Sequence, residues 1–174
     1  SKMTEHEGVS FLVDVGTNAE VVIGNRDWLM ACAGAAGPAL ESGVADMGMM
    51  AAPGVIDSVV INPHTVAFTI GTIPERGGTP ATENRGPMGI CGSGLIDLVS
   101  QLFLAGMIDL MGKFVPDRCG ERLTETDGIG HLMVVPAEAS GTGEPLTLSQ
   151  IDIDGLIRSK AAMYTILTTI AKTV

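Results

Sequence analysis

Residues 11–23 read FLVDVGTNAEVVI, and this stretch decides the fold class of the chain. Two apolar runs flank a short polar step, which is the pattern of a buried strand, a tight turn and a returning strand. Asp14 stands at the end of the first strand, where a carboxylate is costly to bury unless a cation or a hydrogen-bond donor meets it. Gly16 lets backbone N–H groups approach a ligand closely, and Thr17 and Asn18 add polar side chains at the turn.

Two interpretations of this turn remain open on these residues alone. Amide donors at the turn suit the phosphates of a nucleotide, and a strand-end acid can orient the hydrated magnesium ion that accompanies them. The alternative is an ordinary hairpin in which Asp14 makes an Asx-type turn.

Small residues also open two predicted helices. Residues 34–38 read GAAGP and lead into a helix predicted over 38–49, with Pro38 in its first turn, where a missing N–H does least harm. Residues 92–94 read GSG and open a helix predicted over 93–106, in which apolar residues recur at helical spacing. A helix N-terminus of this kind can bind an anion.

The remaining pattern predicts mixed α and β structure. The first three predicted strands form a meander over 9–15, 19–25 and 28–33. Further strands are predicted over 56–62, 66–70, 131–135 and 146–148, and residues 107–130 are expected to be irregular apart from a short strand near 122–124. A last helix is predicted from Ser149 to about Lys172, with Asp152 as the reciprocal acid of its N-cap.

Composition excludes several classes of function. The chain has 174 residues and a formal net charge of −10, which opposes binding to nucleic acid and to anionic membrane surfaces. No apolar run is long enough to span a bilayer, so a cytoplasmic location is expected. Cys32, Cys91 and Cys119 are too widely spaced for a disulfide framework or for an iron–sulfur or zinc motif.

A family resemblance rests on five segments that occur in the family's order over nearly the whole chain. They are 13–20 (VDVGTNAE), 36–41 (AGPALE), 89–97 (GICGSGLID), 135–138 (VPAE) and 152–162 (DIDGLIRSKAA). The chain resembles the C-terminal region of the iron–sulfur reductive activators of corrinoid proteins. That region belongs to the superfamily of acetate and sugar kinases, actin and the chaperone ATPases. Ala19 and Ser42 depart from the family pattern, which commonly has glycine at both positions.

The resemblance implies an α/β fold with a ribonuclease-H-like lobe. Residues 1–49 and 89–174 would form this nucleotide-binding lobe, and residues 50–88 would form an inserted small subdomain. The chain is interpreted as a fragment of a larger protein. The family's N-terminal ferredoxin-like iron–sulfur domain, its first ATPase lobe and its late adenosine motif are not recognisable in this sequence.

The resemblance and the chemistry of the residues together assign the candidate site. Asp14 is expected to orient magnesium-bound water or the attacking water. The predicted donors to the phosphates of ATP, and the residues expected to line their approach, are Gly16, Thr17, Asn18, Gly37, Glu41, Gly92, Ser93 and Gly94. The expected cofactors are ATP and Mg²⁺, and an iron–sulfur cluster is expected only in the N-terminal domain of the complete protein.

By resemblance, the complete protein couples ATP hydrolysis to the reduction of an inactivated Co(II) corrinoid to Co(I). The expected partner is a corrinoid protein that serves in methyl transfer, and a homodimer is also expected. The isolated region is expected to be inactive. Two alternatives stay open: a related ATP-using kinase or dehydratase activator, and a non-catalytic module for dimerisation or docking.

Overall fold

The structure is a computed structural model that describes residues 2–15, 18–35, 45–75 and 86–172. The chain packs into two compact units. Unit 1 comprises Ser1–Pro38 together with Ile157–Val174, and unit 2 comprises Ala39–Leu156. The described helices include none that is both long and apolar enough to cross a bilayer.

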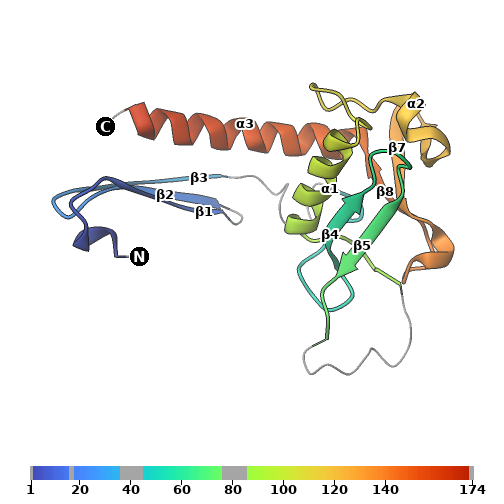
Figure 1. The fold of residues 1–174 in the computed structure, drawn as a ribbon, viewed down its shortest axis with the longest axis horizontal. Coiled ribbons are helices and arrows are strands. Elements are labelled where there is room, and N and C mark those ends of the chain that lie inside the picture. The colour runs from blue at the N-terminus through green and yellow to red at the C-terminus, as the bar shows by residue number, and fades with distance from the viewer. Residues whose placement is uncertain (1, 16–17, 36–44, 76–85, 173–174) are drawn as a thin grey trace. The chain divides into compact units, whose positions relative to one another are not determined.

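Unit 1 is built on a three-stranded antiparallel meander (Figure 1). Its strands are β1 (Ser10–Val15), β2 (Asn18–Gly24) and β3 (Leu29–Ala35), preceded by the short 3-10 helix η1 (Met3–Glu5). The turn between β2 and β3 is closed by the Asn25 side chain, which accepts hydrogen bonds from the N–H groups of Asp27 (2.9 Å) and Trp28 (3.3 Å). The predicted meander is therefore confirmed.

Helix α3 (Gln150–Lys172) covers one face of this sheet with its C-terminal half. Val21 and Ile23 of β2 are buried in one cluster with Ile170 of α3, because alternate residues of a strand point to the same face. A Cβ atom at Gly34 of β3 would collide with the side chain of Ile166. Glycine at this position therefore lets the helix approach the sheet closely.

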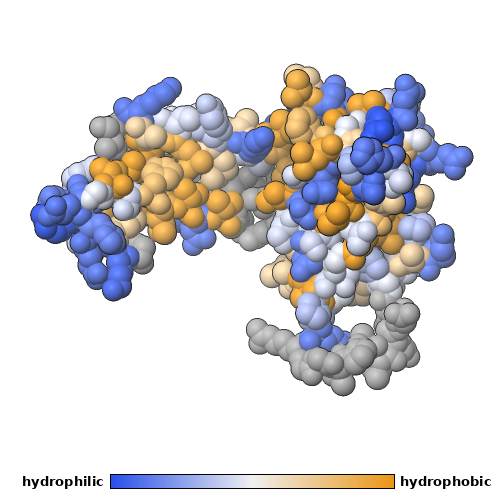
Figure 2. All heavy atoms as spheres, viewed as in Figure 1, coloured by the Kyte–Doolittle hydropathy of each residue, from blue (hydrophilic) through white to orange (hydrophobic). Residues whose placement is uncertain are grey.

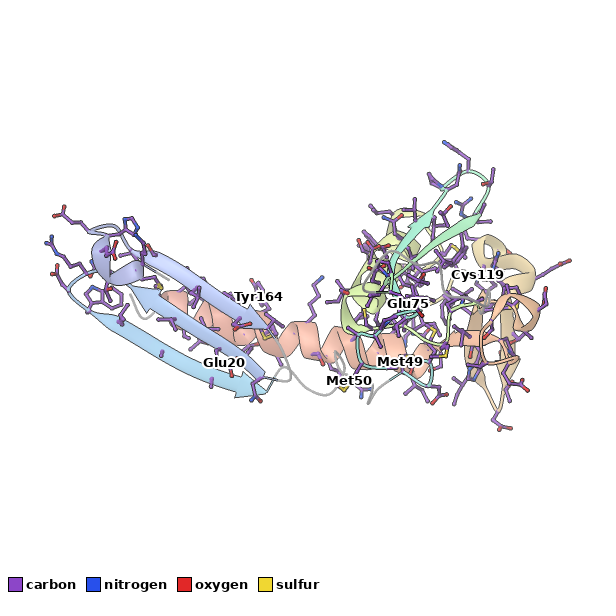
Figure 3. All side chains as sticks on the ribbon, turned by 90° about the horizontal axis from the view of Figure 1, so that it is seen from below. Glu20, Met49, Met50, Glu75, Cys119 and Tyr164 are labelled. Atoms are coloured by element: carbon purple, nitrogen blue, oxygen red, sulfur yellow. The ribbon has the colours of Figure 1, made fainter. Side chains whose placement is uncertain are left out.

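Unit 2 holds two further sheets and most of the buried apolar residues (Figure 1). The hairpin β4 (Ile56–Ile61) and β5 (Phe68–Thr72) packs with helix α1 (Gly92–Leu104). The third sheet contains β6 (Leu123–Thr126), β7 (Ile129–Val135) and β8 (Leu146–Ser149). The short helical segments are α2 (Pro116–Cys119), η3 (Gly120–Arg122) and η4 (Ala137–Ala139). Cys119, labelled in Figure 3, is buried in this core.

Side chains of α1 complete the hydrogen bonding of β4. The Asp97 carboxylate accepts from the N–H of Val59 at 2.7 Å, and the Gln101 side chain accepts from the N–H of Ile61 at 3.1 Å. The predicted inserted subdomain at 50–88 thus shares a core with α1, and its boundaries stay a prediction.

One local prediction was wrong in its C-terminal part. The helix predicted over 38–49 falls partly on residues 36–44, which lie outside the described residues, and residues 45–49 are not helical. Gly48 instead forms a parallel bridge with Ile90, and the Ile90 N–H donates to the carbonyl of Met47 at 2.8 Å. A pairing with a residue about forty positions away overrides the local helical pattern.

The segment 107–130 is more regular than expected, because it contains α2, η3 and β6. Pro116 stands in the first turn of α2, where proline is well tolerated. The other predicted elements are confirmed with small shifts of their ends, including α1, α3 and the strands β4, β5, β7 and β8. The N-cap of α3 is also confirmed. The Ser149 N–H donates to the Asp152 carboxylate at 2.8 Å, and the Asp152 N–H donates to the Ser149 hydroxyl at 3.2 Å.

Candidate functional site

Asp14 lies near the end of β1 and directly opposite Glu20 of β2. Residues that face each other across an antiparallel pair point to the same side of the sheet. Both side chains are exposed, and they lie on the opposite side of β2 from the buried Val21. Glu20 is labelled in Figure 3 on the sheet of unit 1. The hairpin therefore presents two carboxylates on one face, next to its turn.

This carboxylate pair fits a magnesium–nucleotide complex better than a metal ion held by protein alone. Two like charges directly opposite each other destabilise a hairpin, and a bound cation would relieve their repulsion. Mg²⁺ in nucleotide sites keeps several waters and uses one or two carboxylates besides the phosphates. Among the described residues no group of three or more His, Cys, Asp and Glu could hold a metal ion.

The predicted residues around this turn are only partly described. Asn18 begins β2, is exposed and pairs with Ala35 of β3. Gly16, Thr17, Gly37 and Glu41 lie outside the described residues.

The second predicted set lies at the start of α1 in unit 2. Cys91 is the N-cap residue, with an extended backbone, and its side chain accepts no hydrogen bond from the backbone N–H groups of the helix. The first N–H groups of a helix have no acceptor within the helix, so an uncapped first turn can bind an anion. Ser93 is an exposed residue whose hydroxyl lies 3.1 Å from the sulfur of Cys91, and Gly92 is half-buried.

Gly94 has a packing role that the sequence did not reveal. A Cβ atom at this position would stand 2.5 Å from the carbonyl oxygen of Ile56 and 2.9 Å from a side-chain carbon of Ile90. Only glycine therefore lets α1 pack this closely on β4. A role of Gly94 toward phosphate stays a prediction beside this structural role.

The structure brings Asp14 and Asn18 together in unit 1, and Gly92, Ser93 and Gly94 together in unit 2. A common site for the two sets stays a prediction. Glu20 was missed as a candidate, although it stands in the segment that decides the fold. The observed register of β1 and β2 places Glu20 opposite Asp14, whereas a two-residue turn at 17–18, as the sequence pattern predicts, would shift this register by one residue.

Comparison with known proteins places the chain in a family. The family model described as the C-terminal domain of RACo, the ASKHA domain, matches residues 8–174. The chain belongs to this family. The resemblance inferred from the sequence motifs and the α/β fold class are thereby confirmed.

Two relatives of the RACo C-terminal domain family are longer than this chain. The corrinoid activation enzyme RamQ of Eubacterium limosum is 27% identical over 161 residues, which cover 88% of this chain and 25% of that protein. A solved structure of a reductive activator for corrinoid, iron-sulfur protein has 36% identity and a TM-score of 0.85. That match covers 98% of this chain and 26% of the other. The chain thus spans about a quarter of the length of these relatives.

Proposed function

We propose that this chain is the phosphate-binding part of an ATP-dependent reductive activator. The complete protein would return an inactivated Co(II) corrinoid on a partner protein to Co(I). Membership of the RACo C-terminal domain family over residues 8–174 is the observation that carries this proposal. The names of the two relatives, a corrinoid activation enzyme and a reductive activator, support the corrinoid protein as partner.

The residues of the β1–β2 hairpin would bind the nucleotide's metal ion. Asp14 and Glu20 would hold the Mg²⁺ ion that accompanies ATP by accepting hydrogen bonds from its water molecules, and the ion would offset the negative charge of the phosphates. The antiparallel register places both carboxylates on one face of the β1–β2 hairpin, where they could act on the same ion. Asn18, at the start of β2, would donate its side-chain amide to a phosphate.

ATP can drive an unfavourable electron transfer only if the protein's affinity for the partner differs between its states with and without ATP. The protein's states with and without ATP must bind the partner, or its reduced form, with different free energies. A ligand that binds both states equally shifts no equilibrium. The proposal therefore requires that hydrolysis changes the affinity for the corrinoid protein.

A titration with Mg-ATP tests the site. We expect Asp14→Asn in the product of the complete gene to weaken Mg-ATP binding by at least about tenfold, or about 1.4 kcal/mol. The melting temperature should not fall, because Asp14 is exposed and the change removes one of two opposed like charges. Glu20→Gln should behave similarly.

Asp27→Asn is the matched control for this titration. Asp27 is also exposed in unit 1, but it lies in the β2–β3 turn rather than near the β1–β2 turn. Equal affinity of the wild type, Asp14→Asn and Asp27→Asn for Mg-ATP would show that the assigned site is wrong.

The corrinoid function has a separate test. We would mix the complete protein with a reductant and with the corrinoid protein in its Co(II) state. The cobalt absorption is then followed with and without ATP. We expect Co(I) to form only with ATP and not with a non-hydrolysable analogue. Reduction at the same rate without ATP would exclude the coupling, and no reduction under any condition would exclude the corrinoid protein as substrate.

A further inference from the structure

Asp14 and Glu20 are the only charged residues in the three strands of unit 1. They stand directly opposite each other in the register of β1 and β2, where like charges repel. The surroundings are apolar: Leu12 and Val13 of β1 are 39% and 38% exposed, and Figure 2 shows hydrophobic atoms gathered over this sheet. The sheet thus places its two charges where each destabilises the other.

Ala33 of β3 completes the row of side chains that contains this pair. It stands opposite Glu20 in the register of β2 and β3, so Glu20 lies between Asp14 and Ala33 across the sheet. The Cβ atoms of directly opposed residues are about 4.5–5.5 Å apart, and opposite charges at such positions stabilise the sheet. Ala33 is exposed, so a longer side chain would have room there. A lysine at this position could neutralise Glu20 from within the protein, whereas alanine offers only a methyl group.

The basic residues that the structure describes in unit 1 lie away from the face of the pair. Lys2 and Arg26 form ion pairs with acids of the N-terminal segment and of the β2–β3 turn. Arg158, Lys160 and Lys172 belong to α3, which packs on the other face of the sheet. Within the described part of unit 1, position 33 is therefore the place in this row where an internal cation could stand.

We propose that Ala33 sets the cation dependence of this site. Because a methyl group stands where the protein could have supplied its own positive charge, the repulsion between Asp14 and Glu20 is left to an external divalent cation. The methyl group also leaves room for the water molecules that Mg²⁺ keeps. The inference rests on the proposed function for the identity of this ion as the Mg²⁺ that accompanies ATP. Ala33 determines specificity and takes no part in the chemical step.

The affinity for ATP with Mg²⁺ and with EDTA tests this role in the product of the complete gene. We expect the wild type to bind ATP at least about tenfold more tightly with Mg²⁺ than with EDTA. In Ala33→Lys this ratio should fall below about threefold, because the ammonium group neutralises Glu20 and attracts the phosphates without the ion.

Two control variants separate charge from size and from position. Ala33→Met adds a side chain of similar length without a charge, and it should keep the ratio of the wild type. Ala31→Lys adds the same charge at an exposed position of β3, but opposite Val22 instead of Glu20, and should lower the ratio less. An unchanged ratio in Ala33→Lys, or an equal fall in Ala33→Met, would overturn the inference while the proposed function stands. A wild type that binds ATP equally well with EDTA would do the same.

Hydrogen exchange without nucleotide decides the inference if the wild type binds no ATP, a result that would exclude the proposed function. We then expect Mg²⁺, at constant ionic strength, to slow exchange of the β2 amides of the wild type by at least about threefold. In Ala33→Lys the same amides should exchange slowly with or without Mg²⁺, and unchanged exchange in α1 and β7 would report that the variant is folded. In that case, β2 exchange that does not respond to Mg²⁺ in the wild type would refute the role of Ala33.

Discussion

The carboxylate of Asp152 is buried in the first turn of α3. It is 3% exposed, and its oxygen accepts the Ser149 N–H at 2.8 Å. Burial raises its pKa above the usual value of 3.8, although the hydrogen bonds with Ser149 act in the opposite direction. Of the charged groups around it, Asp46 raises the pKa further and His131 lowers it.

A raised carboxyl pKa means that the folded protein binds this proton more tightly than the unfolded chain does. The resulting stabilisation is fully present below the unfolded pKa near 3.8 and is lost as the pH rises through the folded pKa. We expect Asp152→Asn to remove this loss of stability with rising pH, because asparagine has no proton to release. Its side-chain oxygen can still accept the hydrogen bond from the Ser149 N–H. The measurement is the free energy of unfolding by urea at several values of pH from about 4 to 7.

Glu144→Gln is the control for this prediction, since Glu144 is exposed and lies outside the core. Its pH dependence should match that of the wild type. If the free energy of unfolding of Asp152→Asn varied with pH in parallel with that of the wild type above pH 4, burial of this carboxylate would not set the pH dependence of stability.

At the scale of elements, α1 and β4 are held at a distance that only glycine allows. Gly94→Ala places a methyl group against the carbonyl of Ile56, which is backbone and cannot turn away. We expect a loss of about 1–3 kcal/mol of stability, as for overpacked cores. Urea unfolding checks the value, and Gly8→Ala is the control because nothing lies within 4 Å of a Cβ atom there. A stability loss no larger than the control's would contradict the close packing.

The same elements show what the sequence could and could not predict. The meander of unit 1 and helices α1 and α3 follow from local patterns: alternation, helical spacing and caps. The pairing of Gly48 with Ile90 is non-local, and no local pattern in the sequence predicts it. The Asp14–Glu20 pair depends on the register, and one residue in the turn length decides it.

At the scale of the whole molecule, the two units differ in core and in charge. Among the described residues, the buried cluster of unit 2 has nineteen members, whereas that of the sheet and α3 in unit 1 has three. Unit 2 also carries the whole net charge, with fifteen acidic and five basic residues. A small core with an exposed apolar strand predicts low local stability for unit 1.

Native-state hydrogen exchange on the 174-residue chain should reveal this difference. We expect the amides of β2 and β3 to exchange through openings of lower free energy than those of α1 and β7. Ile23→Ala, which costs about 2–5 kcal/mol in a core, should accelerate exchange in unit 1 and leave α1 and β7 unchanged. Leu98→Ala, in the larger core, is the reciprocal variant, and it should accelerate exchange in α1 and β4. If Ile23→Ala accelerated amide exchange equally in both units, the chain would unfold as one cooperative body. A substitution in one of two independent cores should leave exchange in the other unit unchanged.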